Sequence, residues 1–132
     1  MSSADTIWNR ATLQDGGSCP CAGDVALSAV LRLHNLAMSG GLLDAVERLT
    51  EAQLDAAESG YGWLGLPAAA QVVAYVRSEV RAGAPEDDER AESLELVADQ
   101  RYAEIIPVDD TLYGAFRRRL AEEPAAFAST PD

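Results

Sequence analysis

Lysine is absent from this sequence, and all ten basic residues are arginine. Without a lysine the chain cannot form a P-loop for phosphate binding. The 22 acidic residues bring the formal net charge to -12 at pH 7. A field of that sign repels nucleic acid and anionic lipid and attracts basic surfaces. The composition therefore argues against direct binding to nucleic acid or to a membrane, and it predicts a basic partner.

Aromatic residues make up only 6% of the chain, although 48% of it is hydrophobic. The core must therefore consist mainly of alanine, leucine and valine, which suits the packing of helices against one another. No stretch reaches the roughly 20 consecutive apolar residues that a membrane span needs. The first ten residues, MSSADTIWNR, have neither the basic nor the apolar region of a signal peptide. We expect a cytoplasmic protein.

Cysteine and histidine are scarce, because Cys19, Cys21 and His34 are the only residues of these types. Thiolates and an imidazole can bind zinc, but a structural zinc site normally has four such ligands. We favour an unliganded loop in a reducing compartment, with both cysteines dispensable. His34 could serve as a general base, yet no Gly-x-Ser-x-Gly or other nucleophile motif accompanies it. We therefore expect a structural histidine, no metal, no cofactor and no catalytic residues or enzymatic activity.

Helical periodicity runs through most of the 132 residues, a length that fits one domain. We predict an all-α fold, a compact multi-helix single domain without a β-sheet. Residues 1–23 would form an N-terminal helix and loop, residues 24–128 the helical domain and residues 129–132 a tail. Helices are expected over residues 4–14, 25–39, 42–49, 51–63 and 67–82, then from the 84–89 linker to about 106 and from about 110 to 123.

The expected helix ends depend on capping residues and helix breakers. Asp24 would cap the 25–39 helix, and the pair Gly40-Gly41 would end it. Thr50 and Gln53 form a capping-box pattern, and Pro67 stands where a first-turn proline belongs. Gly60, Gly62 and Gly65 are expected to fray the helix that ends near residue 63, and Gly83 to close the next one. Pro107 would end the following helix, and Asp109 or Asp110 would cap the last.

Four carboxylates recur at helical spacing after the 84–89 linker, namely Asp88, Glu92, Glu95 and Asp99. Steps of four, three and four residues place them in one narrow stripe along a helix. The apolar residues of this helix fall on a different face, so we expect the stripe to face solvent. Asp87 and Glu89 flank the stripe. These six acidic residues are the candidate partner-binding surface.

The charge density of this stripe is comparable to that of DNA. Its four charges span about 16.5 Å at a helical rise of ~1.5 Å per residue. One strand of B-DNA places about five phosphates in the same length. Like charges on one helix face cost a few tenths of a kcal/mol for each close pair, a cost that Arg90 and Arg101 would reduce. An ordinary solvated helix face is the competing interpretation of the same pattern.

Three further motifs occur in order between the 25–39 helix and Phe127. The first is the turn Ser39-Gly40-Gly41-Leu42, and the second is the helix pair 56–75, which is interrupted at Leu64-Gly65-Leu66. The third is an acidic and tyrosine-containing region that closes the helical domain: Ala98-Asp99-Gln100-Arg101-Tyr102, Asp109-Asp110-Thr111-Leu112 and Glu123-Pro124-Ala125-Ala126-Phe127. In order and spacing these motifs resemble the DMP-type DNA-mimic protein family of bacterial acidic helical domains.

The resemblance implies an all-helical fold, a homodimer, and a carboxylate surface that imitates DNA and occupies a DNA-binding protein such as a transcription factor. The sequence departs from the family pattern at Ser39 and Leu42, which replace Asn and Phe, and at Ala125 and Ala126, where a glutamate is expected. Two other functions also fit an acidic helical domain. One is an immunity-type or antitoxin-like inhibitor that docks on a toxin through shape, and the other is a helical domain with no DNA-mimic role.

Overall fold

The computed structural model describes residues 2–130, which form seven α-helices and two short 3-10 turns. No strand occurs in this range, so the all-α prediction is confirmed. Residues 131–132 of the expected tail lie outside the described residues. The elements are α1 (Ser3–Leu13), α2 (Ala22–Gly40), α3 (Leu42–Arg48), α4 (Glu51–Trp63), α5 (Pro67–Arg81), η1 (Ala84–Glu86), α6 (Asp88–Ile105), α7 (Asp109–Glu122) and η2 (Pro124–Ala126).

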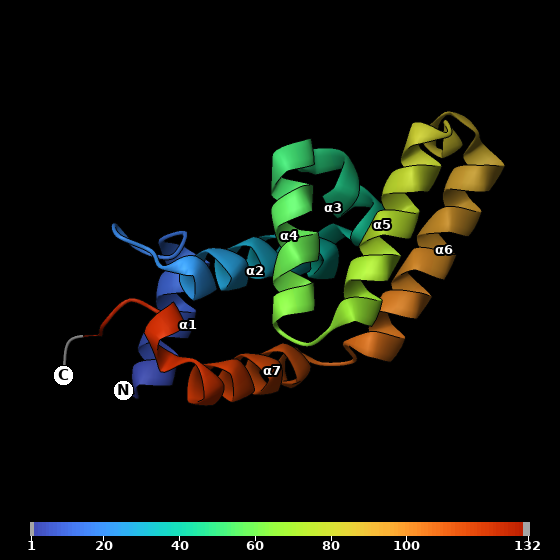
Figure 1. Ribbon diagram of the computed structural model, residues 1–132. Helices are drawn as coiled ribbons and strands as arrows, with labels where there is room; N and C mark the ends of the chain where they lie inside the picture. Colours follow the sequence, from blue (N-terminus) through green and yellow to red (C-terminus); the bar gives the residue numbers. More distant parts are fainter. Residues whose placement is uncertain (1, 131–132) are drawn as a thin grey trace.

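Helix α2 lies at the centre of the body, with α1, α3 and α4 packed against it (Figure 1). Leu27, Val30 and Leu33 of α2 are completely buried. Helices α5 and α6 run side by side next to this body, and α7 returns beneath it towards α1 (Figure 1). Trp8 of α1 then packs against Tyr113 and Phe116 of α7, with ring centroids 5.1 and 5.7 Å apart. The N-terminal and C-terminal helices thus contribute to one core.

Helix α4 crosses α2 closely at Gly60. A β-carbon at this position would lie 2.6 Å from the Ala26 carbonyl oxygen and 2.8 Å from a Val30 methyl group. The expectation that Gly60 frays the end of α4 is therefore wrong, because glycine is needed here for close helix packing. The spacing Gly60-x-Gly62-x-x-Gly65 also matches the dinucleotide-binding motif. These glycines lie at the end of α4 and in the following turn, instead of between a strand and a helix N-terminus, so they form no phosphate loop.

Several helix boundaries follow the predicted local signals. The Gln53 backbone N–H donates to Thr50 Oγ1 at 3.1 Å, and the Thr50 N–H donates to Gln53 Oε1 at 2.9 Å, which confirms the capping box. Helix α5 begins at Pro67. Gly41, with a φ of +93°, follows the last residue of α2, and Gly83, with a φ of +88°, ends the turn after α5.

Two predicted caps are wrong. Helix α2 begins at Ala22, and Cys21 is its N-cap, so Asp24 lies within the first turn. The buried Asp24 carboxylate instead accepts a hydrogen bond from the Cys21 backbone N–H at 2.9 Å. Helix α7 has Val108 as its N-cap, and Asp109 and Asp110 occupy its first turn. The Asp109 side chain binds His34 of α2, 75 residues away in sequence. At Asp109, a long-range contact therefore uses a side chain that local rules assign to helix capping.

Candidate acidic binding surface

Helix α6 carries the predicted acidic residues and is fixed to the body along one face. Leu94, Ala98 and Tyr102 are buried on that face, with exposed fractions of 5% or less. The face packs against α5 and α3. Asp87 caps the helix, because its Oδ1 accepts the Arg90 backbone N–H at 3.2 Å. Burial of one face leaves the opposite face of α6 in solvent.

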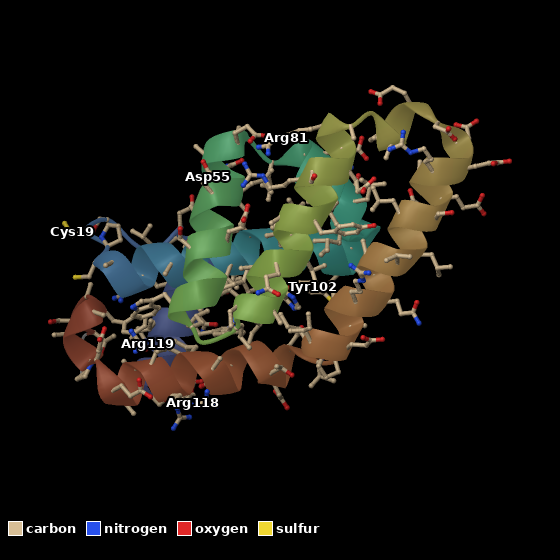
Figure 2. All side chains as sticks on the ribbon, turned by 45° about the vertical axis from the view of Figure 1, so that its right-hand side comes forward. Cys19, Asp55, Arg81, Tyr102, Arg118 and Arg119 are labelled. Carbon is tan, nitrogen blue, oxygen red and sulfur yellow. The ribbon has the colours of Figure 1, made fainter. Side chains whose placement is uncertain are left out.

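Both arginines of α6, Arg90 and Arg101, point towards α5 and not towards the acidic residues of α6 itself. The Arg90 guanidinium lies 3.6 Å from Glu79 Oε2. The Arg101 guanidinium stacks over the Tyr75 ring at 4.8 Å from its centroid. The outer face of α6 therefore carries carboxylates, whose oxygens project along the free side of the helix, together with the exposed side chain of Leu96 (Figure 2). Within residues 2–130, four of the six predicted carboxylates are exposed and form neither an ion pair nor a side-chain hydrogen bond: Asp88, Glu89, Glu92 and Glu95.

Asp99, the last residue of the predicted stripe, has a role in the fold. Its Oδ1 accepts the backbone N–H of Leu42, the first residue of α3, at 2.9 Å. A β-carbon on Gly41 would lie 3.2 Å from Asp99 Oδ2, so the carboxylate lies directly against this turn. All four stripe residues are exposed, as predicted, but Asp99 also bonds to the start of α3. We define the acidic surface as Asp88, Glu89, Glu92 and Glu95, bounded by Asp87 and Asp99.

A second group of carboxylates surrounds Arg77, whose side chain is only 8% exposed. Asp55 and Glu51 of α4 lie 2.9 and 2.5 Å from its guanidinium, and Glu58 also bonds to it. Burial opposes the charge on Arg77, but the hydrogen bonds to Glu58, Glu51 and Asp55 outweigh it and raise its pKa. The hydrogen bond from Arg77 in turn lowers the pKa of Glu51. This group is an ion-pair network between α4 and α5, with Arg77 buried and Glu51 and Asp55 exposed, near the labelled Asp55 and Arg81 (Figure 2).

His34 belongs to a buried chain of hydrogen bonds that joins four helices. Its Nδ1 lies 2.8 Å from the Tyr102 hydroxyl of α6, and its Nε2 lies 2.8 Å from Asp109 Oδ1 of α7. The Tyr102 hydroxyl is also 2.6 Å from the Tyr61 hydroxyl of α4. Burial raises the pKa of both tyrosines. Both ring nitrogens of His34 bond to neighbouring side chains, which is what the structural interpretation expects.

Cys19 is exposed and Cys21 partly buried, and both are free thiols. Within residues 2–130 the structure contains no group of three or more His, Cys, Asp and Glu residues arranged to hold a metal ion. The same described range contains no helix that is both long and apolar enough to span a membrane.

Comparison of the chain with protein-family models, with curated proteins and with solved structures gives no match. Its function must therefore be argued from its own geometry.

Proposed function

We propose that the acidic surface of α6 binds the basic surface of a DNA-binding protein and occupies it in place of DNA. The segregation of charge on α6 is the observation that carries this proposal. Arg90 and Arg101 contact α5, and in the described part of the chain the exposed carboxylates of the acidic surface form no ion pair. A helix face with unpaired carboxylates at roughly the charge spacing of a DNA strand fits a surface that normally contacts phosphates.

The proposed interaction is mainly electrostatic. Complementary charge speeds the encounter of two proteins, and salt weakens it by screening. The net charge of -12 adds a long-range field that favours basic partners. In this proposal the protein acts by binding alone, without a catalytic step.

The test replaces the three stripe residues that have no partner in the described structure, as Asp88→Asn, Glu92→Gln and Glu95→Gln. A matched control removes the same number of exposed, unpaired carboxylates elsewhere, as Glu47→Gln, Glu104→Gln and Asp110→Asn. Each tagged protein is used to capture partners from the cytoplasmic fraction of the source cells at low and high salt. We expect the wild type and the control to capture a basic, DNA-binding protein that duplex DNA releases.

The stripe variant should bind this partner roughly tenfold more weakly, because three charge contacts contribute about 0.5 kcal/mol each. Its thermal stability should stay the same or rise slightly, since like charges on one helix face oppose folding. Capture that resists salt and is unchanged in the stripe variant would exclude the mimic function. The inhibitor that docks through shape would then become the better explanation.

A further inference from the structure

The segment that follows α7 is held to the body in the manner of a bound peptide. After η2 (Pro124–Ala126) the backbone becomes extended at Phe127, with φ -114° and ψ 143°. Phe127 is the single buried side chain between residues 124 and 130. The remainder of the segment is exposed or half-buried, so one anchor and backbone contacts hold it. Figure 1 shows this red segment lying near α1 and the start of α2.

The Phe127 ring occupies a pocket formed by α7, α4 and α2. Its centroid lies 5.5 Å from that of Phe116 and 5.7 Å from that of Trp63. On the α2 side, a β-carbon on Gly23 would lie 2.8 Å from the Ala126 carbonyl oxygen and 3.0 Å from the Phe127 ring. Only glycine at position 23 therefore leaves room for this segment, and α2 presents a bare patch of backbone to it.

Two charged side chains bind the backbone of the segment beyond this pocket. The Asp24 carboxylate, which is completely buried, accepts the Ala128 N–H at 2.7 Å. Arg10 donates to the Ala128 carbonyl at 3.1 Å and to the Ser129 carbonyl at 3.3 Å. Arg10 and Asp24 also pair with each other at 2.8 Å. Because these bonds reach backbone atoms, they do not depend on which side chains the segment carries.

The polar contacts within the site do not all depend on the segment. Asp24 would still accept the Cys21 N–H and pair with Arg10, so its buried charge would remain compensated. The segment also leaves part of the site unfilled. A hollow of about 170 Å³ lies beside it, lined by Arg10, Gly16, Gly17, Ser18, Cys19, Ala128 and Ser129.

We infer that Arg10, Asp24, Gly23 and the aromatic pocket form a peptide-binding site, and that residues 124–130 are its intramolecular occupant. The ligand is an extended segment of a partner protein with a phenylalanine followed by residues whose backbone is free to bond. The chain's own segment blocks the site until such a ligand displaces it. A partner residue larger than Ser129 would extend into the hollow. This inference concerns a different surface from α6 and does not rest on the proposed function.

The test uses a synthetic peptide with the sequence of residues 123–132 and the full-length variant Phe127→Ala, in which the anchor is missing. We expect this variant to bind the peptide saturably. Wild-type protein should bind it at least tenfold more weakly, because its attached segment competes at high effective concentration. A peptide that carries Phe127→Ala should lose at least tenfold in affinity, as expected for an aromatic anchor. The indole N–H signal of Trp63, whose ring lies against that of Phe127, reports binding.

A second form of the protein covers the case in which Phe127→Ala does not fold. A protease site inserted between Glu123 and Pro124 is cut after folding, and the released segment is then allowed to exchange with labelled peptide. Exchange that depends on Phe127 supports the inference. Absence of saturable binding to both forms, or equal binding of the Phe127→Ala peptide, would show that the segment is only part of the core.

Discussion

The hydrogen bonds around His34 can be matched in only one direction when the imidazole is neutral. The Asp109 carboxylate is an acceptor, so the proton of His34 must lie on Nε2. His34 Nδ1 then accepts the Tyr102 O–H, and the Tyr102 oxygen accepts the Tyr61 O–H. In this arrangement the hydroxyl groups of both tyrosines and both ring nitrogens of His34 have a hydrogen-bond partner. The Tyr102 hydroxyl is in the middle, because it bonds to both His34 and Tyr61.

Substitution of the two tyrosines should therefore have unequal effects. Tyr61→Phe removes one terminal hydrogen bond and should cost about 1 kcal/mol of unfolding free energy. Tyr102→Phe leaves both His34 Nδ1 and the Tyr61 hydroxyl without a partner, at about 1–3 kcal/mol each, and should cost at least twice as much. Denaturant unfolding gives both values. Tyr75→Phe is the control, because it keeps the ring under Arg101 and should be nearly neutral. Equal losses of unfolding free energy for Tyr61→Phe and Tyr102→Phe would contradict this arrangement of hydrogen bonds.

At the scale of the helical elements, the close approach of α4 to α2 at Gly60 tests packing against helix propensity. Alanine is the better helix former by about 1 kcal/mol, so Gly→Ala at an unobstructed helical position should stabilise the protein. Gly60→Ala should instead destabilise it by about 1–3 kcal/mol, because the added methyl meets the backbone of α2. Gly114→Ala in α7, with no atom within 4 Å of the new methyl, is the matched control and should raise the melting temperature. A stabilising Gly60→Ala would mean that the two helices lie further apart.

Local sequence signals predicted the helices well because the physics of a helix end is itself local. Thr50 and Gln53, only three residues apart, bond to each other, and Pro67 fixes the first turn of α5 without help from other elements. The errors occur where a side chain bonds to a distant part of the chain. Asp24 binds the segment at residue 128, and Asp109 binds His34. Periodicity within one helix carries no information about such pairs.

The acidic surface was predicted in part for the same reason. Helical spacing correctly placed Asp88, Glu92 and Glu95 on one exposed face of α6. It did not show that Arg90 and Arg101 would both turn to α5, nor that Asp99 would bind α3, because both depend on how neighbouring helices pack. In the sequence the peptide-like segment is marked only by the motif Glu123-Pro124-Ala125-Ala126-Phe127. Its recognition depends on Arg10 and Asp24, which lie at the other end of the chain.

At the scale of the whole molecule, four helices meet at the buried Tyr61 and Tyr102. Ionisation of these two tyrosines should therefore be coupled to unfolding. The raised pKa values of Tyr61 and Tyr102 mean that their neutral forms stabilise the fold. This stabilisation is complete below the ordinary tyrosine pKa of 10.0 and is lost as the pH rises through the higher folded values. We expect tyrosinate absorbance from these residues to appear together with the loss of helical circular dichroism.

The surface residue Tyr113 gives the control for this alkaline transition. Its hydroxyl donates to Asp5, and this hydrogen bond raises its pKa, but the group lies outside the buried chain. Tyr113→Phe should remove one ionising group and leave the pH of unfolding nearly unchanged. Ionisation of all tyrosines while the helical signal stays intact would show that Tyr61 and Tyr102 open to solvent without global unfolding.

The bond between Asp99 and Leu42 connects the edge of the acidic surface to a single backbone amide in another helix. A partner that draws the Asp99 carboxylate away must release the Leu42 N–H, and a partner that leaves Asp99 in place keeps it protected. The rate at which this one proton exchanges with deuterated solvent therefore measures how far along α6 a bound protein reaches. Hydrogen exchange at the Leu42 amide would thus report binding at the end of α6 even if the partner does not contact Leu42 itself.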